Sequence, residues 1–392
     1  MGKAAAPMLA ALLPQIQTSA GCDVAGILIA PEKPPTLPDG FQFFLGGHPL
    51  PNQASFEAAS DALAMLSSVA PSPPEEALCL FLISGGASAM MELPLDPAIS
   101  LQDTIAFHQA LVHSGANIVE MNCVRKHFSA VKGGRLALAA SNVRKLTLLV
   151  SDVPPAHLDA LASGPTLPDT TTVVDCREIL ARYKLLEHFP ASVREYFVSP
   201  SLPETPKPGE LDSPAVTLLD SGELARAAQA HAQALGFHAI IDNACDDWPF
   251  DRAADYLLSR VRALRKDHPR CCVISTGEVS VPVPRFNDAA SHIGGRNQHL
   301  ALYLATQLRA EDKPIAILSA GSDGIDGNSS AAGAVIDQHA VGDSEAHCES
   351  AQGALAACDS STWLTGHHAT IVTGPTGQNL RDLRILLADS ST

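Results

Sequence analysis

The sequence predicts an α/β protein built from two three-layer α/β/α domains with largely parallel sheets. Short apolar runs alternate with amphipathic helical segments along most of the chain, and glycine and polar residues gather where the apolar runs end. A segment at 198–214 holds five prolines and separates two stretches of this alternation. We therefore expect a first domain over residues 1–205 and a second over residues 206–392.

The composition indicates a soluble globular protein with an acidic surface. Of the 392 residues, 46% are hydrophobic and 17% are charged, which excludes the disordered and fibrous classes. The net charge of −16 disfavours a nucleic-acid partner, because such a partner needs a basic surface. No uncharged apolar stretch approaches the roughly 20 residues of a membrane span, so we expect no membrane partner. Nine cysteines without C-x-x-C spacing indicate reduced thiols and no structural zinc.

In the first domain we expect strands at 24–30, 41–47, 77–84 and 145–152, and helices at 4–13, 55–69, 100–116 and 173–186. The run at 77–84 is apolar throughout, as in a strand that is buried on both faces. The helix at 100–116 begins with a capping box that Ser100 and Asp103 form.

In the second domain we expect strands at 215–220, 238–243 and 271–278, and at the apolar runs that begin near 314 and 369. Helices are expected to end near Gly236 and to cover 252–267 and 296–310. The segment "IVTGPTGQNLRDL" is expected to turn from a strand into a helix. Ligands of parallel α/β sheets lie where strands end and helices begin, so the residues at these ends are the candidates for a site.

The first candidate is the turn after the strand at 77–84, which contains Ser84, Gly85, Gly86 and Ser88. Two adjacent glycines allow backbone N–H groups to converge on an anion, and the serine hydroxyls lie beside them. A tight turn without a ligand explains the same residues equally well.

The second candidate is a basic segment in which Arg125, Lys126, Lys132 and Arg135 lie within eleven residues. A solvated helix face is the usual explanation for such a run. However, Arg125 and Lys132 are seven residues apart and would share one helical face, and glycines at 133–134 would let the backbone approach a ligand. The pattern favours a functional role slightly.

Carboxylates follow three of the expected strands. Asp152 and Glu278 each come directly after a strand, and Asp323 and Asp326 follow another among several glycines. The spacing does not match a calcium loop, whereas two carboxylates among glycines suit a magnesium ion that is shared with phosphates.

Two further features point to an anionic ligand. Arg296 lies in the first turn of a helix, where it opposes the helix dipole by about 0.3–1 kcal/mol, so an anionic partner would explain it. Gly374, Thr376, Gly377 and Asn379 form another possible phosphate cradle, for which a capped turn is the alternative.

The absence of several known motifs excludes the common enzyme classes that carry them. No G-x-G occurs in the chain, and neither a P-loop, a G-x-S-x-G elbow nor a protein-kinase catalytic loop is present. Several anion-binding turns, isolated cations and a carboxylate pair are what phosphoryl transfer needs, since its catalysis is mostly positioning and charge stabilisation. The residues alone therefore indicate a phosphotransferase of unfamiliar type.

The motifs together resemble the glycerate 2-kinase family, whose C-terminal domain is called MOFRL. The resemblance covers essentially the whole chain and includes "FLISGGASAMMELP", "SGANIVEMNCVRKHFSAVKGGRLA", "VSDVPPAHLDALASGPTLPD", "GGRNQHLAL" and "SDGIDGNSSAAGAVID". It implies ATP- and Mg²⁺-dependent phosphorylation of D-glycerate to 2-phosphoglycerate in a cleft between the two domains. D-glycerate and a nucleotide would be the partners. Whether the chain forms a homodimer is left undecided, and the expected compartment is the cytoplasm.

The resemblance also implies roles for the candidate residues. The catalytic residues would be Lys3, Arg296 and Asp323, of which Lys3 and Arg296 would act on the transferring phosphoryl group. The substrate would be held by Ser84, Gly85, Gly86, Ser88, Asn122, Arg125 and Lys132. The nucleotide would be held by Gly374, Thr376, Gly377 and Asn379. The metal would be held by Asp152, Glu278 and Asp323.

The chain departs from the family at its opening stretch, "MGKAAAPMLAALL". Relatives usually carry a helical segment and a strand before this Gly-Lys turn, so we expect a sheet that lacks a strand and a Lys3 on a fraying terminus. We favour the interpretation that the true start of the protein lies upstream of Met1. The upstream residues could then include a mitochondrial targeting segment. The first alternative is a catalytically impaired form that only binds ligand. The second is an NAD(P)-dependent hydroxypyruvate reductase, which the absence of a G-x-G dinucleotide-binding motif disfavours.

Overall fold

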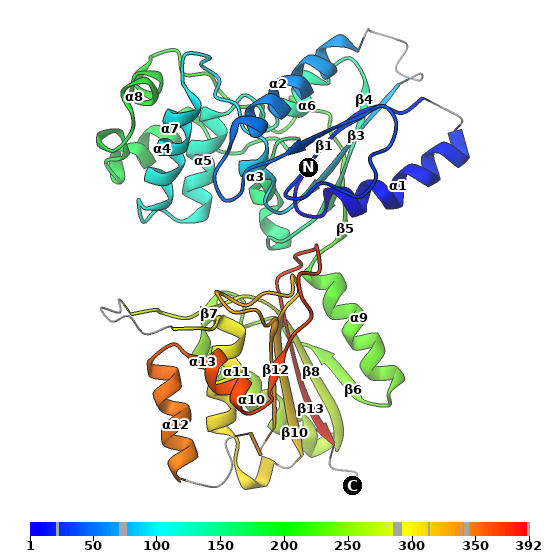
Figure 1. The fold of residues 1–392 in the computed structure, drawn as a ribbon, viewed down its shortest axis with the longest axis vertical. Helices are drawn as coiled ribbons and strands as arrows, with labels where there is room; N and C mark the ends of the chain where they lie inside the picture. Colours follow the sequence, from blue (N-terminus) through cyan, green and yellow to red (C-terminus); the bar gives the residue numbers. More distant parts are fainter. Residues whose placement is uncertain are drawn as a thin grey trace. The chain divides into compact units, whose positions relative to one another are not determined.

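The computed structural model describes residues 1–20, 23–69, 77–284, 292–312, 314–337, 339–340 and 345–389. It divides into two compact units, Met1–Leu218 and Leu219–Thr392, each with strands and helices in alternation (Figure 1). The α/β class is therefore confirmed. The division falls later than the expected boundary between residues 205 and 206, because the chain adds one more strand to the first unit after its proline-rich segment.

The strands of the first unit are β1 (Gly26–Ala30), β2 (Phe41–Leu45), β3 (Leu78–Ser84), β4 (Arg144–Val150) and β5 (Ala215–Leu219). β1 pairs with β2, and the other three form a sheet in the order β3-β4-β5. The pairs β1–β2 and β3–β4 are parallel, as expected.

The first residues of the chain lie between β1 and β3 and hydrogen-bond to both strands. The backbone nitrogen of Met1 donates to Leu82 O at 2.7 Å, and that of Gly2 donates to Ile29 O at 3.1 Å. The backbone N–H of Lys3 likewise donates to Gly85 O at 2.9 Å, directly after β3. Two cavities, of about 550 and 340 Å³, are lined by residues of both β1 and β3.

Helices cover both faces of these strands. α1 (Ala5–Ala20) packs through Leu9 and Leu13 on one face, and α2 (Gln53–Ser68), α3 (Ala87–Met90) and α6 (Arg135–Ala139) pack on the other. A separate helical group consists of α4 (Leu101–Val112), α5 (Ile118–Phe128), α7 (Val173–Arg182) and α8 (Ala191–Val198). Phe107, Phe128 and Phe197 lie in its core. The short 3₁₀ segments are η1 (Pro155–Ser163) and η2 (Leu185–Glu187).

The second unit contains a six-stranded sheet in the order β12-β11-β10-β13-β8-β6. Its strands are β6 (His238–Ile241), β8 (Arg270–Gly277), β10 (Ile315–Gly321), β11 (Gly333–Asp337), β12 (Thr370–Ile371) and β13 (Asp382–Asp389). Only β6 and β8 are parallel, and the four other pairings are antiparallel. The expected parallel pairing is thus found in the first unit and between β6 and β8, whereas β13 lies antiparallel to both β8 and β10, and β11 lies antiparallel to both β10 and β12.

Helices also cover both faces of this sheet, so the expected three-layer arrangement is confirmed here. α9 (Ser221–Ala234) packs on one face. The other face carries α10 (Phe250–Asp267), α11 (Arg296–Gln307), α12 (Glu345–Ala356) and α13 (Ser360–Gly366). The remaining elements are η3 (Ala310–Asp312) and a parallel pair of short strands, β7 (Trp248–Pro249) and β9 (Val279–Ser280).

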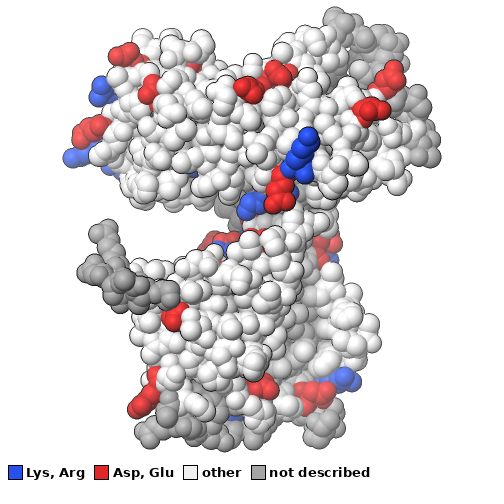
Figure 2. Space-filling view, in the orientation of Figure 1, with Lys and Arg blue, Asp and Glu red and all other residues white. Residues whose placement is uncertain are grey.

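Charged side chains on the face drawn in Figure 2 form small separate groups of both signs on each unit. Among the helices that the structure describes, none is long and apolar enough to cross a membrane.

Candidate functional site

The turn after β3 is built on Ser84, Gly85 and Gly86. β3 ends at Ser84, and Gly86 has a φ of +84°, a left-handed conformation that favours glycine, directly before α3. The Ser84 hydroxyl accepts the backbone N–H of Ala4 at 2.9 Å and lies 3.5 Å from Met1 O. Ser84 therefore holds the opening residues of the chain against this turn.

The two glycines let three ionisable side chains approach the turn closely. A Cβ on Gly85 would lie 1.8 Å from Oδ2 of Asp152, and one on Gly86 would lie 3.2 Å from His48 and 3.3 Å from Lys3. Desolvation, followed by the charge of Lys3, lowers the pKa of His48. Sequence reasoning did not single out His48, which has no local signal beyond a position next to a Gly-Gly pair.

A chain of hydrogen bonds leads from this turn to Arg125. The hydroxyls of Ser88 and Ser163 lie 2.9 Å apart, Ser163 donates to Oδ1 of Asn122 at 3.0 Å, and Arg125 reaches the same oxygen only at 3.4 Å. The Nε of Arg125 is buried and has no hydrogen-bond partner among the described residues. Arg125 therefore has unused donors that could bind a carboxylate or a phosphate.

The prediction that Arg125 and Lys132 share one helical face is wrong, because α5 ends at Phe128. Lys132 is 1% exposed, and its Nζ lies 2.6 Å from Oε2 of Glu92, which also contacts Nε2 of His108 at 2.9 Å. Burial alone would raise the pKa of Glu92, but Lys132 and His108 outweigh it and lower that pKa to about 2. In this structure Lys132 is a buried structural cation.

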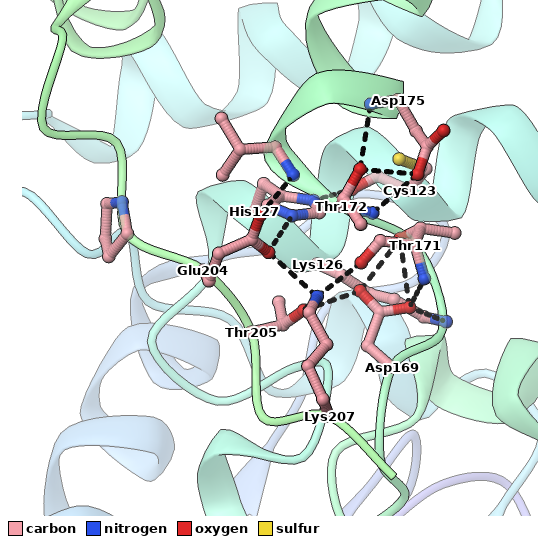
Figure 3. A network of polar contacts seen from close by, with 12 residues as sticks. Cys123, Lys126, His127, Asp169, Thr171, Thr172, Asp175, Glu204, Thr205 and Lys207 are labelled. Carbon is pink, nitrogen blue, oxygen red and sulfur yellow. Dashed lines mark hydrogen bonds and ion pairs between the residues drawn. The ribbon is translucent and has the colours of Figure 1, made fainter.

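Lys126 likewise does not lie on a solvated face. It is 2% exposed, and its Nζ lies 2.8 Å from Oδ2 of Asp159. The same Nζ lies 3.1 Å from Oδ1 of Asp169 (Figure 3). The hydroxyl of Thr205 donates to Asp169 at 2.9 Å in the same network. This network fixes α5, and with it the position of Arg125.

In the second unit Arg296 begins α11 and is held by two carboxylates. Its Nε lies 2.5 Å from Oδ2 of Asp382, and its Nη2 lies 3.1 Å from Oδ1 of Asp382 and 2.8 Å from Oε1 of Glu278. Arg296 therefore has the anionic partner that its position in the helix dipole predicted. In this structure the partner is the protein's own pair of carboxylates, Asp382 and Glu278. Burial raises the pKa of Glu278 in spite of the nearby Arg296.

Asp326 caps the same helix. Its carboxylate accepts the backbone N–H groups of Asn297 at 3.0 Å and Gln298 at 2.8 Å. Burial raises the pKa of Asp326 to about 6, although these N–H groups act in the opposite direction. Asp323, the other member of the predicted carboxylate pair, lines a cavity of about 520 Å³ together with Arg296 and Asp326.

The predicted strand-to-helix turn at 372–381 is wrong, because the segment leads into β13. Thr376 donates its backbone N–H to Asp323 O at 3.0 Å, which ties this loop to the loop after β10. Asn379 accepts a backbone N–H two residues ahead at 2.9 Å and also lines the cavity. Gly374 and Gly377 have φ of +70° and +75° and open space where a Cβ would stand, so a ligand can approach their backbone.

The carboxylates proposed as metal ligands lie in different units: Asp152 belongs to the first, and Glu278 and Asp323 belong to the second. No group of three or more His, Cys, Asp or Glu side chains that could hold a metal is found within the described ranges. Mg²⁺ commonly binds through one or two carboxylates together with substrate phosphates, and the oxygen donors of Glu278 and Asp323 fit that mode.

The chain is similar to known proteins along most of its length. Residues 1–198 match the family described as a domain of unknown function, DUF4147, and residues 271–382 match the MOFRL family. The D-glycerate 2-kinase of Thermotoga maritima is 34% identical over 352 residues, which cover 88% of this chain and 80% of the relative. The glycerate 2-kinase of Pyrococcus horikoshii is 33% identical over 351 residues, which cover 88% and 77%. A crystal structure of a Thermotoga maritima glycerate kinase has a TM-score of 0.85 and 32% sequence identity, and the match covers 99% of this chain and 90% of that one.

Proposed function

Because the chain belongs to the glycerate 2-kinase family, we propose that it transfers the γ-phosphoryl group of ATP to the 2-hydroxyl of D-glycerate, with 2-phosphoglycerate and ADP as products. The observation that carries this proposal is the position of Arg296 on the cavity of about 520 Å³. The guanidinium of Arg296 is held by the carboxylates of Glu278 and Asp382, and a phosphate in the cavity can replace them.

The cavity suits a nucleotide's phosphates for two further reasons. The loop with Gly374 and Gly377 exposes backbone beside Asp323, and backbone N–H groups are common phosphate ligands. Glu278 and Asp323 would bind Mg²⁺, which neutralises phosphate charge when it is bound. Arg296 would stabilise the charge that develops on the transferring phosphoryl group.

The first unit suits glycerate, which carries one carboxylate and two hydroxyls. Arg125 would bind the carboxylate through its unused donors, and Ser88 and Asn122 would bind the hydroxyls. Lys3 would act on the phosphoryl group from the turn after β3. In the transfer, the 2-hydroxyl oxygen bonds to the γ-phosphorus, the bond to the β–γ bridging oxygen breaks, and the hydroxyl proton passes to a carboxylate, for which Asp152 and Asp323 are the candidates.

The proposal is tested by incubating the full chain with ATP, MgCl₂ and D-glycerate and identifying the product by phosphorus NMR. We expect 2-phosphoglycerate and ADP, and an Arg125→Met variant with a KM for glycerate raised about 100-fold. A 3-phosphoglycerate product would contradict the position of transfer. Thermal stabilisation by D-glycerate without any product would instead indicate a binding protein. Oxidation of NADH in the presence of hydroxypyruvate would favour the reductase.

A further inference from the structure

Arg384 is buried without a hydrogen-bond partner for its guanidinium. It lies on β13, between β10 and β8, and is 1% exposed. Within the part of the chain that the structure describes, Nε, Nη1 and Nη2 all lack a partner. An unpaired charge in a protein interior is strongly unfavourable, so the residue calls for a physical explanation.

The position of Arg384 connects it to the candidate site of the second unit. Buried and half-buried residues alternate along β13, so Arg384 lies on the same face as Asp382. Its neighbours in register are Ser319 on β10 and Ser275 on β8, and both are buried. Burial lowers the pKa of Arg384, and the charges of Cys245 and of the carboxylates of Asp382 and Asp246 oppose that effect.

Both of these carboxylates are bound to other arginines. Arg381 binds Asp246 through two hydrogen bonds of 2.6 and 2.7 Å, and its side chain is 5% exposed. Arg296 binds Asp382, but its side chain is 36% exposed and lines the cavity. Arg296 is therefore the partner that a ligand can draw away, and its departure would leave the buried Asp382 without a cation.

We propose that Arg384 is a positioning residue that replaces Arg296 as the counter-ion of Asp382 when Arg296 turns to a phosphate group. The proposal rests on the proposed function, in which Arg296 binds the transferring phosphoryl group. Side chains two residues apart on one face of a strand are separated by about 7 Å, which is within the reach of an arginine. The number of buried ion pairs is then the same before and after the exchange, so Arg296 is released at little free-energy cost.

A purely structural arginine would behave in the opposite way. It would stabilise the unliganded protein, and its removal would lower the melting temperature. An arginine that has no partner until Arg296 leaves destabilises the unliganded protein, and its removal raises the melting temperature. The sign of this change therefore separates the two roles without any assay of activity.

The first experiment measures Tm for the unliganded full chain and four variants. We expect Arg384→Met to raise Tm by a few degrees and Arg296→Met to lower it only slightly, because Arg384 then pairs with Asp382. In the Arg296→Met background, Arg384→Met should lower Tm. The change in Tm that Arg384→Met causes thus has the opposite sign in the two backgrounds. Ser275→Ala is the matched control, because it changes a buried neighbour of Arg384 without changing charge, and it should not raise Tm. A lower Tm for Arg384→Met alone, or additive effects in the double variant, would overturn the proposal.

The second experiment measures the binding of a non-hydrolysable ATP analogue with Mg²⁺ by calorimetry. We expect Arg384→Met to weaken binding about tenfold, because the release of Arg296 then leaves Asp382 unpaired. A crystal structure of the wild type with the analogue should show Arg384 bound to Asp382. If the analogue binds and phosphoglycerate forms but Arg384 stays unpaired, the exchange is wrong and the kinase function stands. If neither the analogue binds nor product forms, the proposed function is wrong, and the exchange is overturned with it even where the sign reversal in Tm persists.

Discussion

Lys132 and Glu92 form an ion pair that is closed to solvent, with Nζ 2.6 Å from Oε2 and side chains that are 1% and 0% exposed. Lys132→Met should destabilise the fold by about 3–5 kcal/mol, because it leaves a buried carboxylate without its cation, with contacts from His108 and the backbone N–H of Leu93 remaining. Urea unfolding followed by circular dichroism measures this loss.

The matched control for this variant is Glu92→Gln combined with Lys132→Met, which removes both charges. It should recover much of the lost stability, because neither partner then remains buried and charged. The folded fraction of Lys132→Met should keep the wild-type KM for D-glycerate. A stable Lys132→Met protein with a raised KM would show that Lys132 contacts the substrate, as the family resemblance implies.

Asp326 should give the protein a specific pH dependence. Burial raises the pKa of its carboxyl group to about 6, so the folded chain binds more protons here than the unfolded chain, and this contribution to stability falls as pH rises from about 4 to about 6. Asp326→Asn removes the titration. The difference in unfolding free energy between wild type and variant should therefore shift by roughly 3 kcal/mol over this range, in favour of the wild type at the acidic end. Urea unfolding across the range measures the shift, and a constant difference would rule out the raised pKa.

Local signals in the sequence located two elements of the second unit correctly. The apolar run that ends before Glu278 predicted β8, and the glycines before Arg296 predicted the start of α11. The unfavourable place of Arg296 in the helix dipole also pointed to an anionic partner. Each of these inferences needs only neighbouring residues, which is why they could be made without a structure.

Long-range pairing could not be predicted in the same way. Lys132 and Glu92 are separated by 40 residues, and nothing near either one marks its partner. β13 was missed because Asp382 and Arg384 interrupt its apolar pattern with charges, so the segment did not resemble a buried strand. The antiparallel direction of β13 depends on its neighbours β8 and β10, and no local signal specifies it.

Gly85 should tolerate no side chain. A Cβ there would lie 1.8 Å from Oδ2 of Asp152, so Gly85→Ala must displace either the turn or the carboxylate. We expect a loss of about 1–3 kcal/mol in stability and a kcat/KM at least about tenfold lower. Gly353→Ala is the control: beyond the local backbone of α12, none of the described residues has an atom within 4 Å of the added Cβ, and alanine in α12 should stabilise the protein by about 0.5–1 kcal/mol. Wild-type activity in Gly85→Ala would contradict the expectation that the reaction needs this turn and Asp152 in their present positions.

Lys3 should act through its charge at the turn after β3. Lys3→Met keeps the length of the side chain and removes the charge, so the pKa of His48 should rise, because desolvation alone then lowers it. If Lys3 also stabilises the transferring phosphoryl group, kcat should fall about 10²–10³-fold. NMR titration of His48 and steady-state kinetics measure the two effects, and Lys3→Arg, which keeps the charge, should leave the pKa of His48 near its wild-type value. A raised pKa with an unchanged kcat would place Lys3 at the turn but outside the chemistry, because the charge would then act on His48 and not on the reacting phosphate.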